Sequence, residues 1–259
     1  MTGPIEVERV LGHPVHPLSK AQAVAAVVRQ GGTHRPGAYV CLTNAHTTVE
    51  SQRSPALRVA VEDAFLSVPD GMPLAWILRH RGHPHTEKVT GIEYMPMVAS
   101  AGLGSGLRHF LYGGRPGVAH RAALRLEELV PGVQIVGAVA PPFVSIPDWP
   151  IADLRRELDR TKPQILWVGL GAPKQELWMQ VMSKVLDVPV MVGVGAAFDY
   201  LAGTVSAAPD YLRHVGLEWL FRLAVEPKRL WRRYLVGNST FVYLVLREEL
   251  LRQVRWHDP

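Results

Sequence analysis

The chain has 259 residues, of which 47% are hydrophobic and 20% charged, and its net charge is +5. This length fits one large domain or two small ones, and the apolar content argues against disorder over most of the chain. Cys41 is the only cysteine, which excludes an intrachain disulfide. The N-terminus lacks the pattern of a signal peptide, and no apolar run is long enough to cross a bilayer. We therefore expect a cytoplasmic protein.

Short apolar runs alternate with helical patterns along most of the chain. Runs typical of strands lie at 5–10, 38–42, 65–68, 108–112, 133–139, 164–168 and 188–193. Helical patterns lie at 20–30, 47–52, 56–62, 72–81, 94–101, 116–129, 151–160 and 173–183. The alternation predicts an α/β fold, a Rossmann-like sandwich with a largely parallel sheet. We expect an α/β catalytic domain at 1–210 and a helical, basic appendage at 211–259.

Polar or glycine-rich residues follow the predicted strands. Because ligands bind beyond the carboxyl ends of parallel strands, we expect these loops to form one site. The residues concerned are Thr43, Asn44, His46, Asp70, Gly71, Gly113, Gly114, Lys174, Gln175, Glu176, Asp199 and Gly203. Several also have a structural interpretation: Thr43 and Asn44 as helix caps, Asp70-Gly71 as a turn with Asp70 as a cap, Gly113-Gly114 as a tight turn, and Asp199 as the partner of a nearby basic residue.

The stretch "WVGLGAPKQELWMQ" (167–180) has the pattern of a strand, a glycine loop and a helix start. Such a helix N-terminus attracts anions through its free N–H groups and its dipole. It is not a Walker loop, because no Ser or Thr follows the lysine. It is not a dinucleotide fingerprint either, because Lys174 replaces the third glycine.

The basic excess of the chain lies in its C-terminal part. Nine basic and four acidic residues occur between 213 and 256, a difference equal to the whole net charge. Trp219, Phe221, Trp231, Tyr234 and Trp256 are interleaved with them. Helices of this kind lie in membrane interfaces, although a packing helix with a solvated basic face is an alternative. No nucleic-acid motif accompanies the charge, so nucleic acid is the least favoured partner.

Seven segments together resemble the WecG/TagA/CpsF glycosyltransferase family from about residue 43 to residue 233. They are "TNAHTTVESQRSPALRVAVEDA", "VPDGMPLAW", "KVTGIEYM", "LYGGRPGVA", "VGLGAPKQELWM", "VGVGAAFDYLAG" and "GLEWLFRLAVEPKRLWRRY". The resemblance implies an inverting transfer of a sugar from a UDP-sugar to a lipid-diphosphate-linked sugar, in the synthesis of a cell-surface polysaccharide or teichoic-acid-type polymer. The sugar would be N-acetylmannosamine, its uronic acid or a hexose, and neither a metal nor another cofactor would be needed.

The residues agree with that chemistry. Inverting transfer needs one base for the acceptor hydroxyl, and Asp70 follows a strand where such a base is expected. The sequence contains no Asp-x-Asp pair for a metal, so helix N-termini and cationic side chains would stabilise the leaving diphosphate.

By resemblance, Gln175 would contact the nucleotide, Asp199 would bind the ribose, and Thr43 and Asn44 would line the sugar side. The other expected substrate contacts are Gly71, Lys88, Gly91, Gly113, Gly114, Lys174, Glu176, Phe198, Arg222, Arg229 and Arg232. Two positions depart from the family pattern, because Lys88 and Ala207 replace arginines. Lys88 keeps the positive charge of an arginine but lacks the planar guanidinium that binds a phosphate through two parallel hydrogen bonds.

The resemblance also implies a polyprenyl-diphosphate acceptor, an anionic membrane surface as partner and a peripheral location on the inner face of the cell membrane. We expect the appendage to close over the active site when the lipid acceptor is present, and homo-oligomerisation stays open. Two alternatives remain. One is a nicotinamide-dependent oxidoreductase, which the missing fingerprint weakens. The other is a non-catalytic membrane scaffold, against which the joint presence of Asp70, Gln175 and Asp199 argues.

Overall fold

The structure is a computed structural model, which describes residues 5–33, 35–142, 151–206, 208–209, 212, 218–225 and 227–255. The side chains at 218, 229, 233, 234 and 253–255 are not part of that description.

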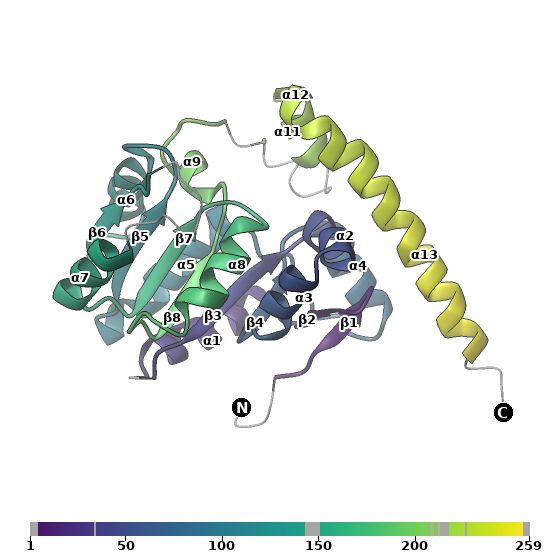
Figure 1. Ribbon diagram of the computed structural model, residues 1–259, viewed down its shortest axis with the longest axis horizontal. Coiled ribbons are helices and arrows are strands. Elements are labelled where there is room, and N and C mark those ends of the chain that lie inside the picture. The colour runs from purple at the N-terminus through teal and green to yellow at the C-terminus, as the bar shows by residue number, and fades with distance from the viewer. Residues whose placement is uncertain are drawn as a thin grey trace.

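Six parallel strands form the central sheet, in the spatial order β4-β3-β8-β7-β5-β6 (Figure 1). They are β3 (Ala38–Thr43), β4 (Leu66–Pro69), β5 (Arg108–Gly113), β6 (Gln134–Val139), β7 (Ile165–Gly169) and β8 (Val190–Gly193). The central strands are buried on both faces, as parallel strands covered by helices are. The predicted α/β fold with a parallel sheet is therefore confirmed.

Helices cover both faces of this sheet (Figure 1). One face packs on α1 (Lys20–Gly31), α5 (Gly91–Gly102), α6 (Val118–Leu129) and α9 (Ala197–Leu201). The other packs on α3 (Pro55–Glu62), α7 (Ile151–Thr161) and α8 (Lys174–Met182). Successive side chains of a strand point to opposite faces, so Val40 enters the first core and Tyr39 the second.

A third, smaller core lies beyond the β4 edge. It joins α2 (Ala45–Arg53), α4 (Met72–His80) and an antiparallel hairpin of β1 (Glu8–Val10) and β2 (His13–Val15). The strand predicted at 5–10 is therefore shorter and lies outside the main sheet. The hairpin turn contains Leu11 and Gly12, both with positive φ, which a leucine rarely adopts.

The C-terminal appendage is helical, as predicted. It comprises α11 (Glu218–Val225), α12 (Pro227–Trp231), a π-helical turn (Arg232–Val236) and the long α13 (Gly237–Arg255). In Figure 1, α13 runs along one side of the molecule and lies beside α2. Phe241 and Val245 of α13 enter the third core. None of the helices in the described part of the chain is both long and apolar enough to span a membrane.

Candidate active site

A cavity of about 120 Å³ lies where β3 and β4 end. It is lined by residues of two loops, three helix starts and the appendage: Asn44, Ala45, His46, Asp70, Gly71, Met72, Pro73, Leu74, Lys88, Thr90, Trp219, Arg222 and Asn238. Five of the predicted site residues, Asn44, Asp70, Gly71, Lys88 and Arg222, are therefore brought together in one cavity.

Three helices that precede the appendage begin at this cavity. Asn44, Gly71 and Thr90 occupy the N-cap positions of α2, α4 and α5. The Oδ1 atom of Asn44 accepts hydrogen bonds from the N–H groups of His46 (3.1 Å) and Thr47 (3.2 Å). A helix N-terminus carries partial positive charge, so three of them beside Lys88 and Arg222 make the cavity favourable for an anion.

Asp70 owes its position to the parallel pairing of β3 and β4. Its N–H donates to the carbonyl oxygen of Thr43 at 2.6 Å, which ties the two strand exits together. The N-cap of α4 is the following Gly71, with φ of +141°, a backbone conformation that favours glycine. The side chain of Asp70 is half-buried and lines the cavity instead of occupying the N-cap position.

Lys88 reaches the cavity from a different segment. The N–H of the neighbouring Val89 donates to the carbonyl oxygen of Pro69 at 2.8 Å. This bond lays the segment before α5 along the exit of β4. A carboxylate and a lysine thus line the same cavity, with Arg222 of α11 as the second cation.

Thr43 lies beneath the cavity in a buried polar chain. Its Oγ1 atom is 2.6 Å from Oγ of Ser67 and 3.3 Å from Nε2 of His13, whose Nδ1 is 3.0 Å from Oγ of Ser51. Burial lowers the pKa of His13 to about 4, so its imidazole is neutral near pH 7. With 1% of its surface exposed, Thr43 braces the strand exits, and its contact with the sugar stays a prediction.

The loop after β7, predicted as a nucleotide contact, is tied to the loop after β8. Oε1 of Gln175 accepts from the N–H of Gly195 at 3.0 Å, and its Nε2 donates to Oε1 of Glu176 at 3.0 Å. Both side chains are almost fully buried. Lys174 is the first residue of α8. The described geometry gives Gln175 and Glu176 a bracing role, and their ligand contacts stay predictions.

Two predicted glycines, Gly113 and Gly91, lie where backbones approach closely, and a third, Gly114, has a positive φ. A Cβ atom on Gly113 would lie 2.5 Å from the backbone of Gly169, and one on Gly91 would lie 2.8 Å from the carbonyl oxygen of Val194. Gly114 has φ of +72°. Packing accounts for the glycine at each position. Their contact with a ligand stays a prediction.

Arg222 connects the segment after β8, which contains Asp199, with the cavity. Oδ1 of Asp199 lies 3.8 Å from Nη2 of Arg115 and accepts from Oγ1 of Thr204 at 3.1 Å. The guanidinium of Arg222 lies 5.6 Å from the centroid of the Tyr200 ring, next to Asp199 in α9. Arg222 therefore touches both the cavity and the loop predicted to bind the nucleotide. Phe198 is fully buried in the sheet core.

The two remaining arginines lie further along the appendage. Arg232 is exposed and stacks over the ring of Trp231, with 5.2 Å to its centroid. Arg229 belongs to α12, but its side chain is outside the described part, as are Ala207 and residues 213–217 and 256–259. Eight cavity residues were not among the predicted site residues: Ala45, His46, Met72, Pro73, Leu74, Thr90, Trp219 and Asn238. Two of them had a signal in the sequence: His46 as a polar residue after a predicted strand, and Trp219 as one of the aromatic residues interleaved with the arginines.

This fold and cavity define an α/β enzyme of the glycosyltransferase class once they are set beside related sequences. The profile described as "Glycosyl transferase WecG/TagA/CpsF family" matches residues 8–255. The chain belongs to that family, which confirms the resemblance and favours a transferase over the oxidoreductase and the scaffold.

A curated relative gives a more specific comparison. The chain is 27% identical over 216 residues to an N-acetylglucosaminyldiphosphoundecaprenol N-acetyl-beta-D-mannosaminyltransferase of Bacillus spizizenii strain W23. The match covers 82% of this chain and 80% of the relative. That enzyme, by its name, transfers N-acetylmannosamine to a lipid-diphosphate-linked N-acetylglucosamine.

Proposed function

We propose that this glycosyltransferase moves a sugar from a UDP-sugar to a lipid-diphosphate-linked sugar with inversion at the anomeric carbon. The observation that carries the proposal is the meeting of Asp70, Lys88 and Arg222 at one cavity beyond a parallel sheet. The named activity of the relative makes N-acetylmannosamine the first donor sugar to test, and a polyprenyl-diphosphate N-acetylglucosamine the first acceptor.

The chemistry is a single displacement. Asp70 takes the proton from the acceptor hydroxyl as that oxygen attacks the anomeric carbon, and the bond to the UDP oxygen breaks on the opposite face. Negative charge then grows on the departing diphosphate. Lys88, Arg222 and the helix N-termini at the cavity stabilise this charge. The loops bearing Gln175 and Asp199 hold the nucleotide.

The decisive variant is Asp70→Asn, which keeps the shape of the side chain but removes the base. Transfer of radiolabelled sugar from UDP-N-acetylmannosamine to the lipid acceptor is expected to fall by about 10²–10⁴-fold. Binding of UDP, measured as a rise in melting temperature, is expected to persist, because the base acts on the acceptor. Asp187→Asn, at an exposed carboxylate, is the matched control. Wild-type turnover by Asp70→Asn would remove Asp70 from this role.

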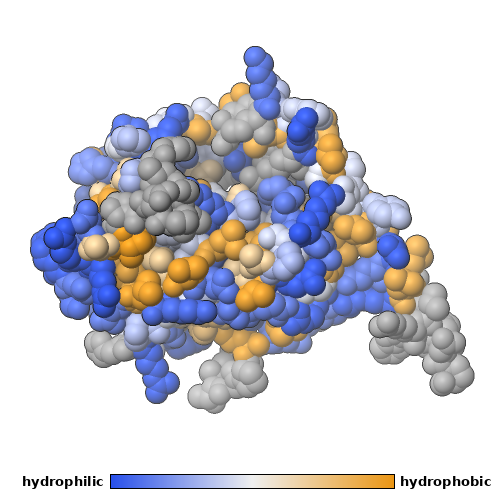
Figure 2. Space-filling view, in the orientation of Figure 1, coloured by the Kyte–Doolittle hydropathy of each residue, from blue (hydrophilic) through white to orange (hydrophobic). Residues whose placement is uncertain are grey.

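A lipid acceptor also requires access to a membrane, and α13 offers an apolar outer face. Val242, Tyr243, Leu246 and Leu250 are between 54% and 65% exposed, and apolar side chains are visible along this helix in Figure 2. Arg232 and its neighbours add positive charge, and each basic residue near anionic lipid contributes about 1 kcal/mol. We propose that this face lies on the inner surface of the cell membrane.

Sedimentation with phosphatidylglycerol vesicles tests this docking. The double variant Leu246→Asn/Leu250→Asn and high salt are each expected to reduce the bound fraction. The control Leu124→Asn/Leu129→Asn alters two exposed leucines of α6 and is expected to bind like the wild type. Equal binding by all variants at all salt concentrations would contradict the proposal.

A further inference from the structure

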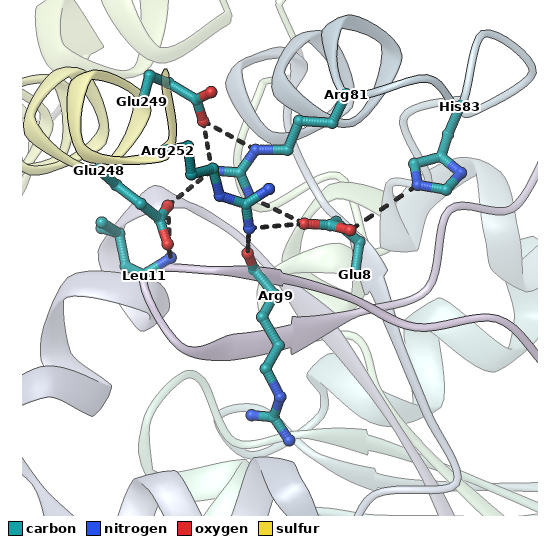
Figure 3. A network of polar contacts seen from close by, with 8 residues as sticks. All are labelled: Glu8, Arg9, Leu11, Arg81, His83, Glu248, Glu249 and Arg252. Carbon is teal, nitrogen blue, oxygen red and sulfur yellow. Dashed lines mark hydrogen bonds and ion pairs between the residues drawn. The ribbon is translucent and has the colours of Figure 1, made fainter. Parts of the chain in front are cut away.

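A polar network outside the cavity surrounds Arg81, at the other end of α4 from Asp70 (Figure 3). Its side chain is only 4% exposed and meets three carboxylates. Nη1 lies 3.2 Å from Oε1 of Glu8, Nη2 lies 2.7 Å from Oε2 of Glu248, and Nε donates to Oε1 of Glu249 at 2.8 Å. Arg81 thus joins the hairpin to α13.

Further bonds complete the same network. Arg252 of α13 donates to Oε1 of Glu8 at 2.8 Å and to the carbonyl oxygen of Arg9 at 3.0 Å. The N–H of Leu11 donates to both carboxylate oxygens of Glu248, at 3.2 and 3.1 Å. Two cations and three anions therefore bind three elements together, and Figure 3 shows them converging from α4, α13 and the hairpin.

This network fixes how α13 lies on the core. Phe241 and Val245 are the buried apolar side chains of the helix, and Glu248 and Arg252 follow them at helical spacing on the same face. Apolar contact alone tolerates rotation and sliding of a helix. Ion pairs with partners at fixed positions oppose such movement, because a shift of the helix would leave charges buried and uncompensated.

The position of α13 matters at the cavity. Asn238 lies in its first turn and about 15 Å along the axis from Glu248, at 1.5 Å per residue. The helix α11, which supplies Trp219 and Arg222, is connected to α13 through α12 and the π-helical turn. Both α4 and α13 therefore extend from the network at one end to the cavity at the other.

We propose that the Arg81 network is a latch that positions the appendage over the cavity, so that Arg81, Glu248 and Glu249 are positioning residues for the transfer reaction. This inference rests on the proposed function. It assigns these residues no contact with substrate. They act through the placement of Arg222, whose charge faces the departing diphosphate.

The test uses the full chain and the double variant Glu248→Gln/Glu249→Gln. Its control is Glu127→Gln/Glu128→Gln, which alters another glutamate pair on an exposed helix face. Hydrogen exchange is measured for amides of α11, α13 and the sheet. In the latch variant, α11 and α13 are expected to exchange roughly 100-fold faster or more, with sheet amides unchanged. Its kcat/KM is expected to fall at least ~10-fold, chiefly through a lower kcat, since the displaced Arg222 no longer stabilises the charge that grows on the diphosphate in the transition state.

Arg81 itself provides a second measurement. Arg81→Lys is expected to lie between the wild type and Arg81→Gln in both the exchange rate and kcat, because lysine keeps the positive charge but cannot bind two carboxylates with a planar guanidinium. Unchanged exchange of α11 and α13 in the glutamate variant would overturn the latch. Faster exchange with wild-type kcat/KM would overturn the positioning role. Exchange needs no substrate, so a wild-type chain without transferase activity would refute the proposed function separately.

Discussion

Stability is expected to fall in mild acid because of a buried histidine in β5. His109 is 1% exposed, and its Nδ1 accepts a hydrogen bond from Nε1 of Trp167 at 3.1 Å. Burial lowers the pKa of His109 from 6.5 to about 4. Between these values the unfolded chain binds the proton and the folded chain does not, so stability is present above pH 6.5 and is lost as the pH falls toward 4.

The magnitude follows from the gap between the two pKa values. At 1.36 kcal/mol per pH unit the gap corresponds to roughly 3 kcal/mol, of which roughly 2 kcal/mol is lost between pH 7 and pH 4.5. The variant His109→Gln keeps an acceptor for Trp167 but cannot titrate. Urea unfolding at both pH values is expected to show a loss smaller by roughly 2 kcal/mol in this variant than in the wild type.

His120→Gln, at an exposed histidine of α6, is the control and is expected to behave as the wild type. His13, whose pKa burial also lowers to about 4, contributes to the acid sensitivity of all three proteins equally. Identical losses in the wild type and in His109→Gln would refute the reasoning.

Two further predictions concern the glycine that ends β5 and the independence of the transfer reaction from metal ions. Gly113→Ala is expected to lower the melting temperature, because φ of +143° strains alanine by about 1–3 kcal/mol and its Cβ would lie 2.5 Å from the Gly169 backbone. Gly104→Ala, with no atom within 4 Å of the added carbon, is expected to be neutral, and equal melting of both variants would contradict the argument. Transfer is expected to persist in excess EDTA, since Lys88 and Arg222 supply the charge that a metal would. Loss of activity restored by Mg²⁺ or Mn²⁺ would disprove this.

The sheet was predictable because its strands are buried on both faces and therefore consist of continuous apolar runs. The predicted strand at 164–168 differs from β7 by one residue at each end. Asp70 was predictable for the same reason, since a polar residue directly after such a run lies at the carboxyl edge. The five-residue α9 was not predicted, because so short a helix shows no apolar periodicity.

The rest of the site depends on contacts that local patterns do not encode. Asn238 lines the cavity because α13 is docked on the core, where Glu248 contacts an arginine 167 positions earlier in the chain. Gln175 is a polar residue after a strand, but its inward direction depends on Gly195 in another loop. Such pairings depend on the tertiary arrangement, and they cannot be predicted from the composition of the chain or from the spacing of residues along it.

The latch also has a consequence for biosynthesis. The last strand of the sheet ends at Gly193, whereas Arg252 can join Glu8 and complete the network only after it has left the ribosome. At about 5–20 residues per second, the 59 residues between Gly193 and Arg252 take roughly 3–12 s to synthesise. Until then the apolar surface that receives Phe241 and Val245 is uncovered. The nascent chain is therefore most exposed to aggregation after its catalytic sheet is complete and before its last helix docks.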